Sequence, residues 1–342
     1  MSSIKEIAKR AKVSIGTVDR ALHGRPQISF KTAEKIRKIA KELNYKPNLF
    51  ARNLKLKKSY LFGVLIPRII DKEYWDLHIK GIDKALRELK CQKVSVKHFY
   101  YYDRLFDEHY AKDIRRILCE KLDGLLIAPI FYDVAEKFIK QLPPDLPYVF
   151  LSTKVPQTNY LTHIGQDNFQ SGVVAAKLMS FLLREKGTIA IIDAFPSDYH
   201  IMERTKGFFS FFNNNPDYSI KIYYHDRTKP ESESCRLPET VFNENTELRG
   251  VCIPGGVAAD FAACLEKQNL ANRVCIIGYD LIERSKKNLK NGTIDFIISQ
   301  NPEAQGYQGI YSLYQRCVLR QSPPKEILML IDIITRENMD YF

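Results

Sequence analysis

The residues with the clearest chemical potential are the cations that crowd the N-terminal end of the chain. Residues 1–60 hold 16 Lys and Arg but only four acidic residues, a net charge of +12, which equals the formal charge of the whole 342-residue protein. The other residues carry 36 basic and 36 acidic groups and are neutral. This asymmetry predicts a short module that binds a polyanion, either nucleic acid or an anionic membrane surface, joined to a neutral body.

Helical spacing would position these cations. Apolar residues between Ile4 and Ala11 recur at the intervals of one buried helix face, and Ser14 is a good N-cap for a second helix over residues 15–22. Ser29 can cap a third helix, which Pro47 ends. Two short helices across a tight turn predict a helix-turn-helix unit, whose second helix would enter a major groove. A plain amphipathic bundle with solvated cations is the alternative.

Ordered motifs run through this segment and into the first predicted strand. They are Ile4-Lys5-Glu6-Ile7-Ala8, Ala11-Lys12-Val13-Ser14, Thr17-Val18, Arg20, Leu43-Asn44-Tyr45-Lys46-Pro47-Asn48, Ala51-Arg52-Asn53-Leu54 and Ser59-Tyr60-Leu61-Phe62-Gly63-Val64. In this order they resemble the lactose repressor (LacI/GalR) family of bacterial transcription regulators. The resemblance implies an all-α DNA-binding headpiece over residues 1–46, a hinge helix or linker over 47–60, and a ligand-binding and dimerisation core over 61–342.

The resemblance also implies which residues contact DNA. They are Ser14, Ile15, Gly16, Thr17, Asp19, Arg20, Asn48, Ala51, Arg52 and Leu54. Arg20 can donate a bidentate hydrogen bond to guanine, a contact worth roughly 1 to 3 kcal/mol of discrimination. Ile15 and Gly16 offer little direct readout, so Arg20 should dominate. Asp19 replaces the small hydroxyl residue usual in the family, which leaves the details of half-site readout open.

The resemblance also implies how the hinge contacts DNA. Leu54 would insert as an apolar wedge into the minor groove, with a buried contact onto the core as the alternative. Because two hinge helices must pack together for this, the resemblance implies a homodimer on pseudo-palindromic operator DNA.

Beyond the hinge, short apolar runs alternate with helical patterns. We expect strands at residues 61–66, 93–99, 124–128, 148–151, 188–193, 220–224, 250–254, 274–278 and 296–299, and helices at 77–89, 113–120, 173–184, 257–268 and 305–320. This alternation predicts parallel sheets with helices on both faces.

The resemblance implies how this body divides. It would be an α/β core of two doubly wound, parallel-sheet subdomains of the type I periplasmic-binding-protein kind, joined by three crossovers. We expect the crossovers near residues 157–163, 288–295 and 320–326. The first lobe would then hold approximately residues 61–160 and 292–322, and the second lobe 163–290 and 325–342.

Residues that follow strands in such folds are candidates for a ligand site. They are Tyr74, Trp75, Asp133, Arg204, Gly255, Asp280 and Gln300. The resemblance places Tyr74 and Trp75 where relatives cover a sugar ring, although core packing is the alternative for Trp75. Asp280 and Arg204 would suit a vicinal diol, with a structural ion pair as the alternative. Gly255-Gly256 stands where relatives often carry Asn-Asp, and a strand-to-helix turn explains it better than a phosphate site.

The remaining sequence argues against several classes. No HExxH, GxSxG or Walker A motif occurs, so we expect neither an enzyme nor a cofactor. The seven cysteines lack zinc-site spacing, so we expect reduced core residues and no metal. No apolar run approaches the roughly 18 residues of a membrane span, and the N-terminus lacks the apolar stretch of a signal peptide. We therefore expect a cytoplasmic, nucleoid-associated protein that contacts no membrane.

Together these features predict a ligand-responsive, sequence-specific DNA-binding regulator, most simply a repressor of genes for sugar uptake or catabolism. Its effector would be a sugar or a sugar derivative. The alternatives are a nucleoside or nucleobase effector, or a protein partner that acts on the core. The sequence does not reveal whether the effector releases the protein from DNA or tightens its binding.

Overall fold

The computed structural model describes residues 4–22, 28–43, 58–67, 72–101, 114–194, 198–226 and 229–342. The chain forms two compact units, Met1–Lys58 and Ser59–Phe342. The division between the units falls two residues before the expected end of the hinge at residue 60.

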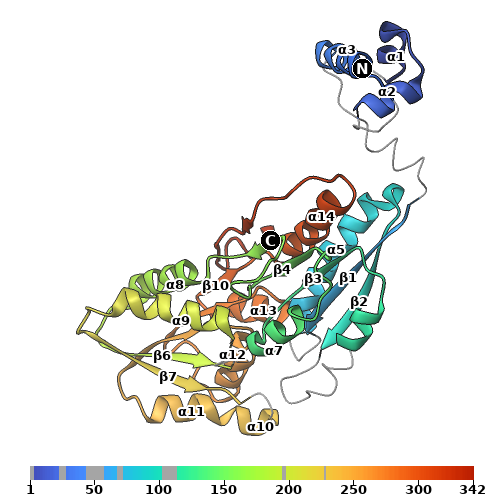
Figure 1. Cartoon of the computed structure of the whole chain (residues 1–342). Coiled ribbons are helices and arrows are strands. Elements are labelled where there is room, and N and C mark those ends of the chain that lie inside the picture. Colours follow the sequence, from blue (N-terminus) through green and yellow to red (C-terminus); the bar gives the residue numbers. More distant parts are fainter. Residues whose placement is uncertain are drawn as a thin grey trace. The chain divides into compact units, whose positions relative to one another are not determined.

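The first unit is a three-helix headpiece built from α1 (Ile4–Ala11), α2 (Ile15–Leu22) and α3 (Phe30–Glu42) (Figure 1). Its core is small, and Ile7, Val18 and Ile36 are fully buried at its centre, one from each helix. The Oγ atom of Ser29 accepts a hydrogen bond from the backbone N–H of Thr32 at 3.2 Å and so caps α3. The predicted helix-turn-helix unit is confirmed.

The second unit contains two six-stranded sheets. The first sheet runs in the order β11-β5-β4-β3-β1-β2, and its strands pair in parallel throughout. Its strands are β1 (Tyr60–Pro67), β2 (Val94–Tyr101), β3 (Gly124–Ile127), β4 (Tyr148–Leu151), β5 (Thr162–Gly165) and β11 (Glu326–Leu328). The helices of this lobe include α5 (Lys72–Glu88), α7 (Tyr132–Ile139) and α14 (Pro302–Cys317), together with the short 3-10 helix η1 (Lys90–Gln92).

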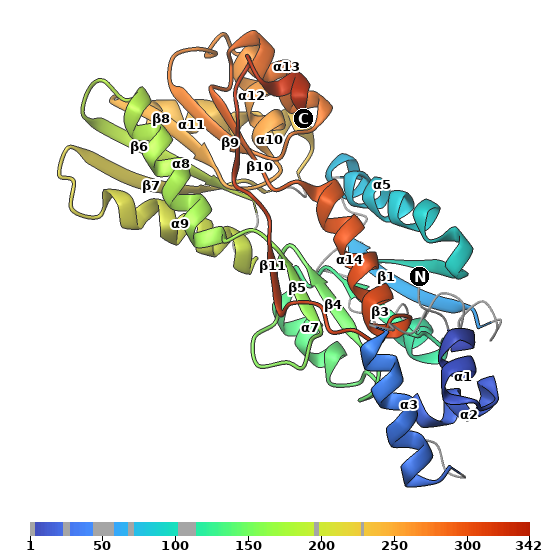
Figure 2. The ribbon, with the colours of Figure 1, turned by 90° about the horizontal axis from the view of Figure 1, so that it is seen from above.

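The second sheet runs in the order β12-β10-β9-β8-β6-β7 and is parallel except for β12. Its strands are β6 (Gly187–Asp193), β7 (Tyr218–Tyr224), β8 (Leu248–Ile253), β9 (Cys275–Tyr279), β10 (Phe296–Ser299) and β12 (Asp332–Ile334). Its helices are α8 (Asn168–Leu182), α9 (Tyr199–Phe212), α10 (Glu231–Ser234), α11 (Arg236–Asn243), α12 (Ala258–Lys267), α13 (Glu283–Asn291) and the 3-10 helix η2 (Met339–Tyr341). Figure 2 shows the two sheets as separate halves of the core.

Alternate residues of β6 show why helices cover both faces of the second sheet. Ile189 and Ile191 pack in a cluster with Phe208 of α9, whereas Ile192 packs in a different cluster with Phe261 of α12. Successive side chains of a strand point to opposite faces, so a continuous apolar strand needs a covering layer on each side. The expected doubly wound, parallel α/β architecture is confirmed, with the antiparallel β12 as a local departure.

Each of the expected strands is present, with its ends shifted by at most two residues. The division between the lobes differs from expectation. Because β5 pairs with β4, β10 pairs with β9 and β11 pairs with β5, the chain crosses between the lobes at residues 166–167, 300–301 and 329–331. Residues 292–299 therefore lie in the second lobe and residues 163–165 and 325–328 in the first. Short apolar runs look alike in both lobes, and only strand pairing assigns them.

Glycines bring the main helix pairs of each lobe into close contact. A Cβ atom added at Gly81 of α5 would lie 1.8 Å from the carbonyl oxygen of Glu303 in α14, and one at Gly172 of α8 would lie 1.9 Å from the carbonyl oxygen of Arg204 in α9. Both distances are too short for any side chain, so the helix backbones touch at these two points.

The cysteines are the clearest correction to the sequence-based picture. Cys235, at the start of α11, and Cys264 of α12 form a disulfide bond. Cys91 and Cys119 are exposed rather than in the core, while Cys252 and Cys317 are buried as expected. Residues 29 positions apart become partners only because α11 and α12 lie side by side, with the two Cα atoms 5.1 Å apart.

We predict that Gly81→Ala destabilises the protein although alanine favours helix. Helix propensity alone would stabilise the variant by about 1 kcal/mol, but the clash with Glu303 should reverse the sign and lower the free energy of unfolding by about 1 to 3 kcal/mol. Urea unfolding followed by circular dichroism measures the difference, with the exposed neighbour Lys80→Ala as control. A Gly81→Ala variant as stable as the native protein would contradict the close helix contact.

We also predict that Cys235→Ser lowers the stability of the oxidised protein. Closing a loop of this length stabilises a fold by about 3 to 4 kcal/mol in the chain-entropy treatment. The thermal midpoint of the native protein should fall on addition of dithiothreitol, whereas that of Cys235→Ser should not change. Cys91→Ser, at an exposed free cysteine, serves as control and should respond to the reductant like the native protein. An unchanged native midpoint would argue against the disulfide.

Candidate functional site

The predicted base-reading residues lie on the outer side of α2. Val18 and Ala21 anchor the helix in the headpiece core, and this leaves Arg20 and Ile15 exposed, the latter by 47%. An exposed guanidinium and an exposed apolar side chain on one helix match the chemistry of a guanine edge and a thymine methyl group. Gly16 is also exposed but has no side chain to contribute.

Two hydroxyl groups organise the beginning of α2. The Oγ atom of Ser14 accepts a hydrogen bond from the backbone N–H of Thr17 at 3.1 Å and lies 2.9 Å from the Oγ1 atom of Thr17. Ser14 therefore caps the helix, as its sequence position predicted. Asp19 is only half-buried and stands beside Arg20 in the same helix.

The hinge predictions cannot be compared with the structure. Asn48, Ala51, Arg52 and Leu54 lie outside the described residues. Their roles in the minor groove remain predictions.

In the core, three of the predicted ligand residues form one buried cluster in the second lobe. Arg204 comes from α9, Asp280 directly follows β9 and Gln300 directly follows β10, and they are 1%, 7% and 2% exposed. The Nε2 atom of Gln300 donates a hydrogen bond to the Oδ1 atom of Asp280 at 2.8 Å. Asp280 adopts a left-handed backbone conformation with φ of 71°, which turns the chain sharply at the end of its strand.

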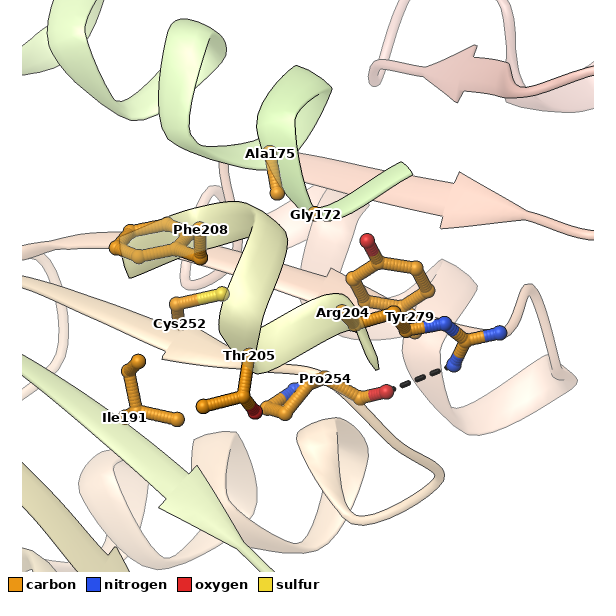
Figure 3. A pocket seen from close by; sticks show the side chains of 9 residues that line it. All are labelled: Gly172, Ala175, Ile191, Arg204, Thr205, Phe208, Cys252, Pro254 and Tyr279. Atoms are coloured by element: carbon orange, nitrogen blue, oxygen red, sulfur yellow. Dashed lines mark hydrogen bonds between the residues drawn. The ribbon is translucent and has the colours of Figure 1, made fainter. Parts of the chain in front are cut away.

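Arg204 is held by two groups that the sequence did not single out. Its Nη1 atom donates to the carbonyl oxygen of Pro254 at 2.7 Å, and its guanidinium carbon lies 4.2 Å from the centre of the Tyr279 ring (Figure 3). Stacking on an aromatic face and bonding to a carbonyl oxygen both favour a buried cation. Tyr279 immediately precedes Asp280, so its place at the end of β9 was the signal available in the sequence.

Charge and burial act against each other in this cluster. Burial raises the pKa of Asp280, while the nearby charge of Arg204 and the hydrogen bond from Gln300 lower it. Burial, assisted by the charge of Arg204, holds the pKa of His200 well below its usual value, so His200 is neutral near pH 7. Arg204 thus supplies the positive charge of the cluster.

The loop after β8 contributes its backbone to the cluster. Gly255 is buried, as is Pro254, and the carbonyl oxygen of Pro254 accepts the hydrogen bond from Arg204. The loop leads directly into α12, in agreement with a strand-to-helix turn.

The two predicted aromatic residues lie in the first lobe and are packed. Tyr74 and Trp75 of α5 are 8% and 7% exposed, and Trp75 stacks on His78 with ring centres 4.6 Å apart. Their hydrophobic cluster also includes Ala259 and Ile282 from the second lobe. In this arrangement the rings make packing contacts rather than line an open cleft. Burial lowers the pKa of His78 to about 4, so this ring stays neutral.

A charged contact also joins the lobes. Arg284 of α13 lies 3.6 Å from a carboxylate oxygen of Glu73 in α5 and pairs with Asp260 of α12. Asp133 is exposed in the first turn of α7, and none of the described contacts brings it into the Arg204 cluster.

A small hollow lies beside the cluster, and it has no room for a water molecule. Its lining includes Gly172 and Ala175 of α8, Phe208 of α9 and Cys252 of β8, so it lies inside the second lobe and not between the lobes (Figure 3). The hollow is too small to hold a sugar in this arrangement, since small-molecule sites usually measure about 300 to 1,000 Å³. The guanidinium of Arg204 points away from Phe208, towards the carbonyl oxygen of Pro254.

Within the described parts of the chain, no group of three or more His, Cys, Asp or Glu side chains is arranged to hold a metal ion. None of their helices is long and apolar enough to cross a membrane.

Comparison with known proteins identifies both units. Residues 3–48 match the bacterial regulatory proteins of the lacI family, and residues 62–318 match the periplasmic binding protein domain. The ribose operon repressor of Lactococcus lactis subsp. lactis is 26% identical over 293 residues, which cover 84% of this chain and 83% of the repressor. The sucrose operon repressor from the same subspecies is 29% identical over 182 residues, 52% of each chain.

The solved structures agree. A crystal structure described as that of a LacI transcriptional regulator from Bacteroides fragilis covers 83% of this chain and 100% of its own, with 25% identity and a TM-score of 0.75. The chain therefore belongs to the periplasmic-binding-protein family through its core, and its headpiece is a domain of the lacI family of bacterial regulatory proteins.

Proposed function

We propose that this protein is a ligand-responsive repressor that binds pseudo-palindromic operator DNA as a homodimer and controls genes for sugar uptake or catabolism. The observation that carries the DNA-binding part is the headpiece itself. It concentrates the net charge of the chain and exposes Arg20 on the second helix of a helix-turn-helix unit. The known relatives are regulators of transcription, which supports a role without catalysis. This function places the protein with the DNA, inside the cell.

The headpiece supports two kinds of contact with DNA, one to phosphates and one to bases. The many Lys and Arg residues neutralise phosphates, which gives affinity without sequence preference and makes binding sensitive to salt. Arg20 supplies the specific contact, supported by the apolar Ile15. Asp19, next to Arg20, either orients the guanidinium or accepts from a cytosine amino group.

The core supports an effector site at Arg204, Asp280 and Gln300. These side chains follow strands or face strand ends of the second sheet, where ligands of open parallel sheets bind. The relatives are named for ribose and sucrose operons, which favours a sugar or sugar derivative as effector. Ala259 and Ile282 of the second lobe belong to the same hydrophobic cluster as the buried aromatic residues of the first lobe, so we infer that entry of a ligand requires the lobes to separate. Effector binding would then shift the balance between lobe arrangements and change the affinity for DNA.

The packing of the first-lobe aromatic residues supports a second candidate function, a response to a protein partner. Tyr74 and Trp75 are already covered by the protein itself, so a core that responds to a protein partner would need no open cleft. The buried polar cluster argues for the small-molecule effector, because side chains of this kind are costly to bury without a binding role.

We predict that Arg20→Ala removes sequence preference but leaves weak, salt-sensitive DNA binding. The ratio of affinities for the selected operator and a scrambled duplex should fall by roughly 10- to 100-fold, since one bidentate contact to guanine is lost. Fluorescence anisotropy at two salt concentrations measures both affinities. Arg37→Ala, at an exposed position of α3, should lower the affinity for both duplexes alike and preserve the ratio of the two affinities. Equal losses on both duplexes for Arg20→Ala would contradict its assignment.

We further predict that a sugar or sugar derivative stabilises the full-length protein and changes its affinity for the operator. Thermal-shift screening of pentoses, hexoses, sugar acids and nucleosides should find such a compound. Asp280→Ala should weaken its binding by at least about tenfold, because a buried acceptor for its hydroxyl groups is lost. The exposed Asp133→Ala serves as a matched control and should bind normally. If no compound in the library stabilises the protein, the protein-partner alternative is favoured.

A further inference from the structure

The guanidinium of Arg204 has an unused edge. Arg204 is 1% exposed, and its Nη1 atom is bonded to Pro254, yet its Nε and Nη2 atoms meet no hydrogen-bond acceptor among the described residues. In a planar guanidinium, Nε and one terminal nitrogen form a fork that points two parallel N–H groups in one direction. Two charged donors without acceptors are expensive to bury, so this edge calls for an acceptor from outside the chain.

The neighbouring residues do not supply that acceptor. Tyr279 contacts the face of the guanidinium and not its edge, and Gly255 and Gly256, in the adjacent loop, have no side chains. His200, the other ionisable side chain that feels the charge of Arg204 from α9 itself, is neutral. Asp280 is the acidic group within electrostatic reach, and its Oδ1 atom is engaged by Gln300.

Gln300 has a buried acceptor that lacks a donor. While its Nε2 atom bonds to Asp280, its Oε1 atom is buried and meets no donor among the described residues. A ligand that satisfies the whole cluster must therefore present two acceptors to Arg204 and a donor to Gln300. Carboxylate oxygens accept only, and they match the two parallel N–H groups of arginine, whereas a hydroxyl group can donate to the amide oxygen.

We propose that the effector is a polyhydroxylated carboxylic acid, that is, a sugar acid, whose carboxylate binds the Nε and Nη2 atoms of Arg204 and whose hydroxyl group donates to Gln300. This inference rests on the proposed function, because it places the effector at the same buried cluster. A neutral sugar fits less well, since each hydroxyl that accepts from Arg204 keeps a proton that needs another acceptor, and the charge of the arginine stays uncompensated.

Asp280 is the group that opposes this assignment, because two carboxylates repel each other. Its hydrogen bond to Gln300 suits it to a hydroxyl group of the same ligand rather than to the ligand's carboxylate. Burial also raises its pKa, which favours the neutral form and reduces the repulsion when an acid enters the cluster.

Matched pairs of ligands test the inference on the full-length protein. Isothermal titration calorimetry should compare galacturonate with galactose and glucuronate with glucose, which differ only in a carboxylate in place of a hydroxymethyl group, and gluconate with glucitol. We expect at least one acid to bind about tenfold or more tightly than its neutral partner, as a charge-assisted pair of hydrogen bonds implies. Acetate at the same concentrations should not compete, because it lacks hydroxyl groups.

Arg204→Gln should abolish the preference for that acid over its neutral partner, and Arg204→Lys should recover only part of the preference, because lysine keeps the charge without the fork. If Arg204→Gln does not fold, Gln300→Met serves instead. This variant should lower the affinity for the acid, but the protein should still bind the acid more tightly than the neutral sugar.

The outcomes distinguish failure of the sugar-acid inference from failure of the proposed sugar effector. Tighter binding of the neutral sugar in every pair would overturn the sugar-acid inference and leave the sugar-responsive repressor standing. Equal competition by acetate would also overturn it, since the hydroxyl contact would then be irrelevant. If no member of any pair binds, both the sugar acid and the sugar effector are wrong, and DNA binding is unaffected.

Discussion

The burial of one guanidinium organises the second lobe. Arg204 lies where α9 meets the ends of β8 and β9, and it contacts Pro254 and Tyr279 there. The carbonyl oxygen of the same residue lies against Gly172, so α8 approaches α9 backbone to backbone at this point. A buried cation tolerates little displacement, because a lost partner leaves a charge in a medium of low dielectric. The positions of two helices and two strand ends are therefore set by the requirement to keep this group bonded.

The same constraint bears on the proposed effector site. Asp280 and Gln300 follow neighbouring strands, and each is held by the other more than by solvent. The lobes meet nearby through Ala259 and Ile282, and Arg284 adds a charged contact to Glu73. In the proposed function, an effector that binds the cluster would alter these contacts between the lobes and so change the affinity for DNA.

Much of the fold was predictable from local pattern. The headpiece helices follow from apolar spacing and from capping residues such as Ser29, and the central strands follow from short apolar runs that end at turns. The sequence missed β5, β11 and β12, which are only three or four residues long, and it assigned β10 to the wrong lobe. Short strands carry too little periodicity to identify, and their sheet depends on pairing with distant strands. For the site, residue type and position after a strand singled out Arg204, Asp280 and Gln300 correctly as neighbours, whereas Asp133 lies apart.

The sequence by itself determined the two-part organisation of this protein. The confinement of the excess charge to residues 1–60 and the order of the N-terminal motifs are properties of the linear chain, and they required no coordinates. Only the tertiary structure decided that Cys235 pairs with Cys264, that the aromatic residues of α5 are covered, and that Arg204 has two unused donors. The physical reason is that these properties depend on which groups from distant segments exclude water together, and spacing along the chain contains no measure of that.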